Sequence, residues 1–175
     1  MPKLRTQSLL CLAVPVITAG AAHAGGIELT VEIPKLSVAE YHRPYVAIWI
    51  EDASGKVAAN LSVWYDVDLK DSEGEKWLKD IRQWWRRTGR TLNMPMDGVS
   101  SPTKAPGVNK VTFPSDKGAL AKLAPGEYKL VVEATREVGG KEMVEIPFKW
   151  APGTEATASA KGKEELGAIT LKLTK

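Results

Sequence analysis

Hydrophobic and polar residues alternate with a period of two along most of this 175-residue chain. Because successive side chains of a β-strand point to opposite faces, this alternation predicts strands with one buried face and one exposed face. The run GIELTVEI at 26–33 shows the pattern clearly, since apolar residues occupy every second position. Its repetition along the chain restricts the protein to a fold built mainly from β-strands.

Seven segments carry the strand pattern, and turn-forming sequences separate most of them. Residues 44–52 are apolar on both faces, which predicts a central strand, and Pro147 predicts an edge position for its own strand. The number of strands and the short turns favour a seven-stranded antiparallel sandwich of immunoglobulin-like architecture. The expected strands are 26–34, 44–52, 57–65, 108–114, 124–137, 142–150 and 166–173.

Between the third and fourth expected strands the period changes to that of a helix. Ser72 and Glu75 have the spacing of a capping box, and Gly89 is a natural helix stop. We therefore expect one inserted amphipathic α-helix at about 73–87, with an apolar face and a mostly basic face. The apolar positions are Trp77, Leu78, Ile81, Trp84 and Trp85.

Two segments lack any core signal and are expected to be loops. Residues 88–107 show no periodicity, and a loop of about 20 residues inside a compact domain is often functional when it is ordered. Residues 151–163 consist mainly of small, polar and basic residues and are expected to form a mobile loop.

The first 24 residues have the three parts of a secretory signal peptide. A positively charged start precedes the apolar run LLCLAVPVITAG, which is too short to span a bilayer, and Ala-His-Ala follows at 22–24. We therefore expect export, cleavage after Ala24 and a single mature domain at 25–175. No apolar run in this mature part is long enough to cross a membrane.

Removal of the signal segment changes the composition in ways that exclude several kinds of site. Lys3 and Arg5 are two of the 24 basic residues, which leaves 22 against 21 acidic residues and no charge argument for nucleic-acid binding. The one cysteine lies in the removed segment, and His42 is the single mature histidine. Thiolate chemistry and multi-histidine metal sites are therefore excluded, and no clear nucleophile–base pair of an enzyme is present.

Two polar features have both a structural and a functional interpretation. Acidic residues cluster at 66–75, but Gly74 does not have the position that a calcium-binding loop requires, so we expect no metal site. His42 precedes a strand and is either a structural hydrogen-bonding residue or part of a ligand or partner surface.

Trp84 and Trp85 are adjacent in the expected helix and therefore point about 100° apart. If one indole is buried, the other is partly exposed beside several cations, which suits a planar anionic ligand or a protein partner. The alternative is a helix that is half core and half solvated charge. The neighbouring cations are Arg82, Arg86, Arg87 and Arg90.

Several segments, taken in order, resemble the periplasmic family called domain of unknown function 2271. They are YHRPYVAIWIED at 41–52, KWLKDIRQWWR at 76–86, DGVSSPT at 97–103, PGEYKLVVEATRE at 125–137 and ELGAITLKL at 165–173. The resemblance implies a periplasmic protein of an iron-uptake or flavin-linked electron-transfer system. It also implies association with PepSY-type membrane reductases and with FAD:protein FMN transferase.

The same resemblance suggests a flavin attachment site. Proteins modified by the FMN transferase carry Asp-x-x-(Ser/Thr)-Gly-Ala-(Thr/Ser), whose last hydroxyl receives FMN through a phosphodiester. Asp97, Ser100 and Thr103 match this motif, with Thr103 as the acceptor, while Ser101 and Pro102 replace the glycine and alanine. Proline fixes φ and lacks an N–H, so this departure from the motif counts against a pliable acceptor loop.

The sequence therefore supports two main functional hypotheses. In the first, a non-enzymatic binding or accessory protein docks a membrane reductase through its Arg/Trp helix face. In the second, the protein is a flavoprotein electron carrier with FMN on Thr103, where Arg86 pairs with the phosphate and Trp85 stacks on the ring. A metal- or small-ligand-binding module is a further alternative. The expected docking residues are Trp84, Arg82, Arg87, Arg90 and His42.

Overall fold

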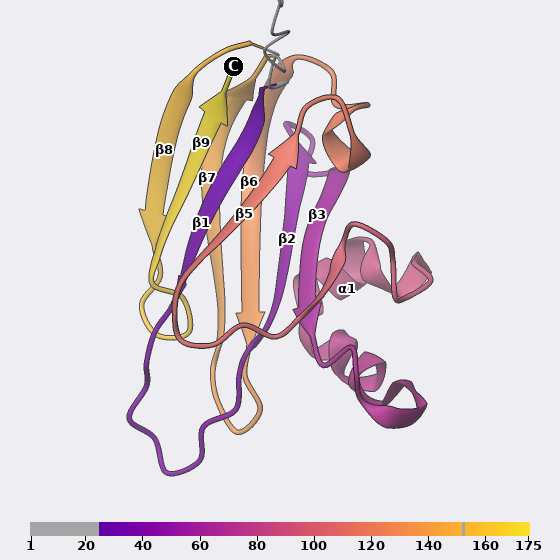
Figure 1. Cartoon of the computed structure of the whole chain (residues 1–175), viewed down its shortest axis with the longest axis vertical. Helices are drawn as coiled ribbons and strands as arrows, with labels where there is room; N and C mark the ends of the chain where they lie inside the picture. The colour runs from indigo at the N-terminus through magenta and orange to yellow at the C-terminus, as the bar shows by residue number, and fades with distance from the viewer. Residues whose placement is uncertain (1–24, 152) are drawn as a thin grey trace, which may run out of the picture.

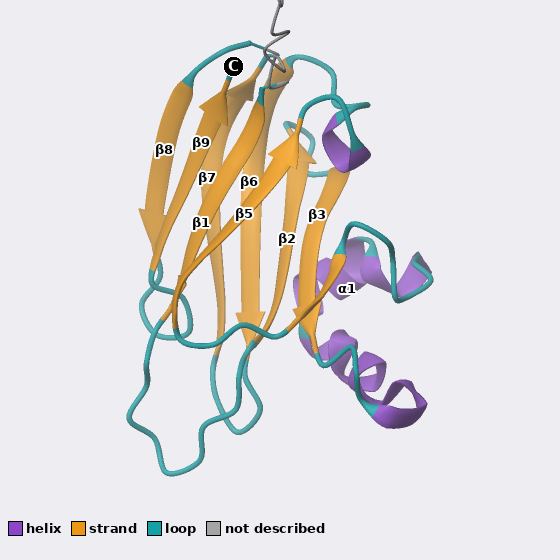
Figure 2. Ribbon diagram, viewed as in Figure 1, coloured by secondary structure: helices purple, strands orange, loops and turns teal. Residues whose placement is uncertain are grey.

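The structure is a computed structural model that describes residues 25–151 and 153–175. The expected signal segment 1–24 and its cleavage site lie outside the described residues. Two sheets form the molecule, and their strands run along its long axis (Figure 1; Figure 2). The four-stranded sheet has the order β5 (Gly107–Pro114), β1 (Gly26–Ile33), β9 (Ala168–Thr174), β8 (Ala156–Lys161). The five-stranded sheet has the order β4 (Ser100–Pro102), β3 (Val57–Tyr65), β2 (Tyr45–Asp52), β6 (Gly126–Thr135), β7 (Lys141–Trp150).

The two sheets share one hydrophobic core, which follows directly from the alternation in the sequence. Ile27 and Leu29 of β1 and Ile48 of β2 belong to the same buried cluster. Ile169 of β9 and Val132 of β6 belong to it as well, so both sheets contribute their inner faces. Burial of these apolar faces is the main favourable contribution to folding.

The expected β-rich fold is confirmed, and a strand forms within or across each of the seven expected segments. Two further strands, β4 and β8, make nine among the described residues, so the count of seven was too low. β4 pairs parallel with β3, so the five-stranded sheet is not wholly antiparallel. The immunoglobulin-like architecture stays a prediction.

β8 lies inside residues 151–163, which we expected to form a mobile loop. It pairs antiparallel with β9 over its whole length, and Ala158 and Ala160 pack against the core. The hydrophobic signal was too weak to find this edge strand because alanine contributes little apolar area, while backbone pairing with β9 holds the strand in place.

A β-bulge in β3 changes which residues face the core. Ile48 pairs with Ser62 and Trp49 pairs with Asn60, so Leu61 is left without a partner in β2. Ala59 and Leu61 belong to the core between the sheets, whereas Val63 and Tyr65 belong to a second cluster on the outer face, against which Val57 also packs. The prediction that all alternate residues of 57–65 share one face was therefore wrong.

The single helix expected at 73–87 is broken into two parts at Ile81. A 3₁₀ segment, η1 (Lys70–Asp80), precedes a short helix, α1 (Arg82–Arg87), and a 3₁₀ turn, η2 (Gly89–Thr91), follows. Ser72 has a left-handed backbone with φ of 54°, and the segment has no side-chain cap hydrogen bond, so the expected capping box is absent. η2 and β4 also interrupt the loop expected at 88–107.

These helical segments cover the outer face of the five-stranded sheet beside β3 (Figure 2). Leu78 of η1, Ile81 and Trp84 of α1 are buried against Trp49 and Val131 of the sheet. A further 3₁₀ turn, η3 (Gly118–Leu120), places Leu120 in the core between the sheets. Within the described residues, no helix has the length and apolar character to cross a membrane.

Candidate functional site

Five strand ends meet at one end of the five-stranded sheet, the lower end in Figure 1. β2 and β7 begin there and β3, β4 and β6 end there, because Tyr45 pairs with Thr135 and Thr135 pairs with Lys141. A pocket of about 620 Å³ opens at this end. Its lining residues are Tyr41, His42, Arg43, Tyr45, Asp66, Leu69, Trp77, Asp80, Thr103, Thr135, Arg136, Glu137, Val138 and Lys141.

One wall of the pocket is formed by the residues that follow β3 and β4. The Thr103 hydroxyl donates to one Asp66 oxygen at 3.1 Å, and the Tyr45 hydroxyl donates to the other at 3.3 Å. Burial, with the negative charge of Asp66 adding to it, raises the pKa of Tyr45 to about 12. The Tyr45 hydroxyl therefore stays protonated and acts as a donor at neutral pH.

The exposed Trp77 belongs to the same wall. Its side chain is 50% exposed although it is large and apolar, and Lys79 Nζ lies 5.7 Å from its ring centroid. Leu69, also exposed, lines the pocket beside it. This wall therefore presents an aromatic surface next to two acidic groups, Asp66 and Asp80.

The opposite wall contains Arg136, whose residue surface is only 8% exposed. Its Nε and Nη2 donate to the carboxylate of buried Glu165 at 2.9 and 3.0 Å. Glu165 also accepts the Gly140 N–H at 2.8 Å. Hydrogen bonding to Glu165 raises the pKa of Arg136, so the guanidinium remains charged inside the protein.

Tyr41 and His42 close this wall from the segment between β1 and β2. The Tyr41 ring centroid lies 6.0 Å from the Arg136 Cζ atom, and burial raises the pKa of the Tyr41 hydroxyl. His42 lies between two carboxylates, with Nε2 3.0 Å from Glu40 and Nδ1 3.6 Å from Glu137. His42 thus lines the pocket, and this position is compatible with the expected role in ligand or partner binding.

The expected flavin motif is fixed to the sheet. Ser100 and Ser101 pair with β3, and the Thr103 N–H donates to the Tyr65 carbonyl at 3.2 Å. The Ser100 hydroxyl accepts the Met96 N–H at 2.9 Å, and Asp97 is exposed. Thr103 itself is half-buried on the pocket wall, so its hydroxyl is at a cavity while its backbone is held in place.

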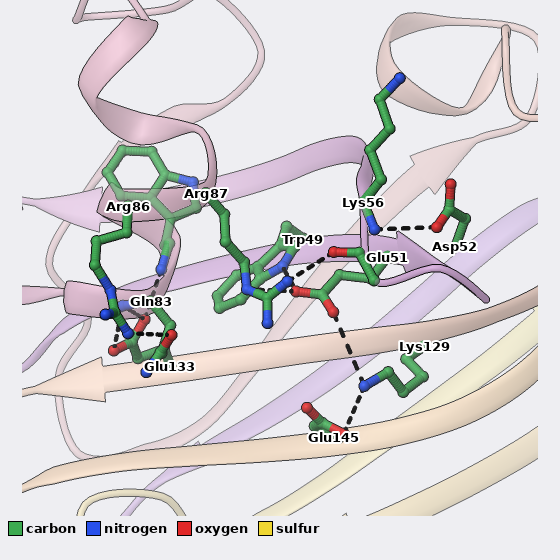
Figure 3. A network of polar contacts seen from close by, with 12 residues as sticks. Trp49, Glu51, Asp52, Lys56, Gln83, Arg86, Arg87, Lys129, Glu133 and Glu145 are labelled. Carbon is green, nitrogen blue, oxygen red and sulfur yellow. Dashed lines mark hydrogen bonds and ion pairs between the residues drawn. The ribbon is translucent and has the colours of Figure 1, made fainter.

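The expected basic residues do not gather around Thr103. Arg87 donates to the Gly55 carbonyl at 2.6 Å and pairs with Glu51 at 3.2 Å, beside the turn that joins β2 and β3 (Figure 3). Thr103 lies near Tyr65 at the far end of β3, about 26 Å away along the strand. Arg86 instead bonds Gln83 within α1, and Arg82 and Arg90 are exposed.

The two adjacent tryptophans of α1 differ in exposure, as expected for neighbours in a helix. Trp84 is fully buried, and its indole N–H donates to Asn60 at 2.9 Å. Trp85 is half-buried, and its ring centroid lies 6.3 Å from that of Trp84. Neither lines the pocket, whose aromatic residues are Tyr41, Tyr45 and Trp77.

Sequence reasoning found Thr103 and His42 but missed the other pocket residues. Asp66 and Arg136 directly follow strands 57–65 and 126–135, and polar residues just beyond strand ends are a usable signal once neighbouring strands are known. The order of strands in the sheet is a tertiary property, so the sequence alone did not show that they share a wall.

Among residues 25–151 and 153–175, no group of three or more histidine, cysteine, aspartate or glutamate side chains is arranged to hold a metal ion. Comparison with curated proteins and with solved structures found no match. A family model described as a predicted periplasmic protein (DUF2271) matches residues 26–168, which is most of the chain. Because this match covers more than half of the chain, the chain belongs to the family of predicted periplasmic proteins called domain of unknown function 2271.

Proposed function

We propose that this protein is a non-enzymatic binding protein of the periplasm that holds a small ligand in the pocket at the end of the five-stranded sheet. The observation that supports the proposal is the pocket itself, with a volume of about 620 Å³. Pockets of roughly 300–1,000 Å³ with an apolar surface and a few converging polar groups are typical of small-molecule sites. Here the apolar surface comes from Trp77 and Leu69, and the polar groups come from both walls.

The proposal is tested by NMR on the ¹⁵N-labelled mature protein with a library of amino acids, dicarboxylates and mononucleotides that includes FMN. A ligand of this pocket shifts the amide signals of Thr103 and Thr135 and leaves those at the opposite end of the sheet unchanged. Leu69→Trp narrows the pocket and abolishes the shifts. Val108→Trp, at an exposed position on β5 outside the pocket, retains them. Library hits confined to other surfaces would refute the proposal.

A second candidate is the flavoprotein carrier with FMN on Thr103. It is favoured by one observation, the placement of the Thr103 hydroxyl on the pocket wall beside the Asp66 carboxylate. The arginine and lysine side chains that line the pocket with Thr103 are Arg43, Arg136 and Lys141, in place of the expected Arg86. Against it stands the fixed backbone of 100–103, which a transferase must distort.

Co-expression with an FMN transferase and export to the periplasm tests this candidate. The expected product is a yellow protein whose flavin absorbance survives denaturation and whose mass has increased by one FMN group. Thr103→Ala abolishes the label, whereas Ser101→Ala retains it. A colourless protein of unmodified mass, under conditions that label a control acceptor completely, rules the carrier out.

Docking of a PepSY-type membrane reductase is the accessory role that the family resemblance suggests. The exposed residues available for this role are Arg82, Arg86 and Arg90, because Trp84 is buried and Arg87 is paired with Glu51. Arg86→Glu is expected to weaken binding to the purified reductase in nanodiscs, whereas Lys110→Glu on the other sheet leaves it unchanged. Equal binding by both variants argues against this surface.

A further inference from the structure

The Arg136 guanidinium is held in one position with one of its nitrogens unused. Glu165 occupies the edge formed by Nε and Nη2. The Gly139 backbone packs so closely on the guanidinium that any added side chain would overlap it. The Tyr41 ring lies over it at 6.0 Å from Cζ. Nη1 is left without a hydrogen-bond partner although it is buried.

The Tyr41 hydroxyl is another buried polar atom of this wall without a hydrogen-bond partner, and His42 Nε2 is a third, although it lies 3.0 Å from a Glu40 oxygen. Buried donors in folded proteins nearly always have a partner, and exceptions call for an explanation. Nη1 of Arg136 and the Tyr41 hydroxyl both belong to residues that line the pocket, and both can donate to an oxyanion. A charged guanidinium that is already fixed loses little entropy on binding and so favours a carboxylate.

The charges across the pocket argue against a highly charged anion. Arg43 and Lys141 add positive charge near Arg136, but Glu137 also lines the pocket and Glu165 already neutralises Arg136 itself. The opposite wall carries Asp66 and Asp80, which have no cationic partner among the ion pairs of the described residues. A ligand with a single carboxylate at one end and a cationic group at the other matches this arrangement.

The strand order sets the distance between the two ends. Asp66 follows β3 and Arg136 follows β6, and these strands flank β2 on either side. Two strand spacings separate them, which is about 10 Å. An extended peptide spans roughly 3.3–3.6 Å per residue, so about three residues cover this distance.

We propose that the pocket binds a short peptide of about three residues with free termini. Its carboxylate is held by Arg136 Nη1 and the Tyr41 hydroxyl, and its ammonium group by Asp66 and Asp80. This inference rests on the proposed ligand-binding function and names the ligand class. Because both donors are shielded from solvent, the Tyr41 side chain shifts outward when the carboxylate enters.

Titration of the ¹⁵N-labelled mature protein with trialanine tests the proposal. The peptide is expected to shift the amide signals of Thr135, Gly139 and Gly140. Trialanine amide, which lacks the carboxylate, is expected to bind at least about tenfold more weakly. N-acetyl-trialanine, which lacks the ammonium group, is expected to bind about threefold more weakly, because ion pairs with partly exposed carboxylates are screened. Equal affinities for all three peptides overturn the proposal.

Two variants test the residues, and both are designed to retain the fold. Tyr41→Phe removes the hydroxyl and keeps the ring over Arg136, and trialanine binding is expected to fall roughly tenfold. Arg136→Lys keeps a positive charge for Glu165 and removes Nη1. Trialanine binding by this variant is also expected to fall roughly tenfold. Tyr128→Phe is the matched control, because that hydroxyl bonds Ala124 near the opposite end of β6. Unchanged binding by Tyr41→Phe and by a folded Arg136→Lys overturns the assignment.

A titration with inorganic phosphate tests whether the pocket binds a different oxyanion instead of the peptide carboxylate. Phosphate that shifts the same amides while trialanine shifts none overturns the proposal. If trialanine is silent but other library compounds shift the pocket amides, the peptide assignment fails and the ligand-binding function stands. If the whole library is silent as well, the proposed function fails with it.

Discussion

At the scale of single residues, Val138 has an unusual backbone in the turn between β6 and β7. Its φ is 51°, which lies in the left-handed region, and its side chain is 77% exposed. A β-branched residue is disfavoured in this conformation because its Cβ crowds the backbone. Val138 also lines the pocket, so this strain is located at the candidate site.

Val138→Asn is therefore expected to stabilise the protein by about 1 kcal/mol, because asparagine tolerates the left-handed conformation. Urea denaturation at neutral pH measures the change in the free energy of unfolding. Val108→Asn serves as the control, since Val108 is exposed on β5 in extended backbone and gains nothing from asparagine. A loss of stability in Val138→Asn would show that the valine side chain makes a favourable contact there.

At the scale of elements, two buried carboxylates attach α1 to the five-stranded sheet (Figure 3). Glu133 of β6 accepts the N–H groups of Gln83 and Trp84 at 3.0 and 2.9 Å. Glu51 of β2 accepts the Trp49 indole N–H at 2.8 Å and pairs with Arg87. The Glu133 carboxylate takes the place of a helix cap, because the first N–H groups of a helix have no partner within it.

Glu133→Gln is expected to lower the stability of the protein by about 1–2 kcal/mol, because a neutral amide is a weaker acceptor for these N–H groups. Hydrogen exchange is expected to accelerate at the amides of Gln83 and Trp84 while the central strand β2 stays protected. Glu145→Gln on the exposed face of β7 provides the comparison and leaves exchange in α1 unchanged. Uniform acceleration across the whole molecule would contradict a local role for Glu133.

At the scale of the whole molecule, the connection between β8 and β9 is tied to three other strands by carboxylates. Glu142 of β7 accepts backbone N–H groups of Lys163, Glu164 and Leu166. Glu32 of β1 accepts the Ala168 N–H at 2.8 Å. Glu165 itself pairs with Arg136, which follows β6. The bonds of Glu142 and Glu165 join the two sheets at the pocket end of the molecule, whereas the bond of Glu32 lies within the four-stranded sheet.

Glu142 is expected to make stability depend on pH in the acid range. Burial works against its charged form, but the backbone N–H bonds together lower the pKa of this carboxyl below 4.5. A carboxyl with a lowered folded-state pKa stabilises the protein fully above about pH 4.5, and this contribution is lost as pH falls through the folded-state value. Protonation therefore loosens the β8–β9 connection.

Glu142→Gln is expected to cost about 1–2 kcal/mol at neutral pH and to flatten the loss of stability below about pH 4.5. Urea midpoints measured between neutral and acid pH for the variant and the wild type give the two slopes. Parallel curves would show that Glu142 makes no contribution to the acid dependence.

The sequence by itself determined seven of the nine strands among the described residues and much of the core between the sheets. The face of each side chain depends only on its position in the strand, so the alternating segment 26–33 and the segment 44–52, apolar on both faces, were predicted correctly as strands. The central position of β2 and the edge position of β7 also followed from residue type. Export and cleavage after Ala24 stay predictions because 1–24 lies outside the described residues.

Only the tertiary structure decided where the helix breaks and where the functional groups meet. Glu133, far from α1 in the sequence, supplies the acceptor that caps α1, and pairing with β9 makes a strand of 156–161. The pocket joins Tyr41, Asp66 and Arg136, which are distant along the chain and meet only because β2 lies between β3 and β6. Strand order depends on long-range packing energies, which no local pattern of residues contains.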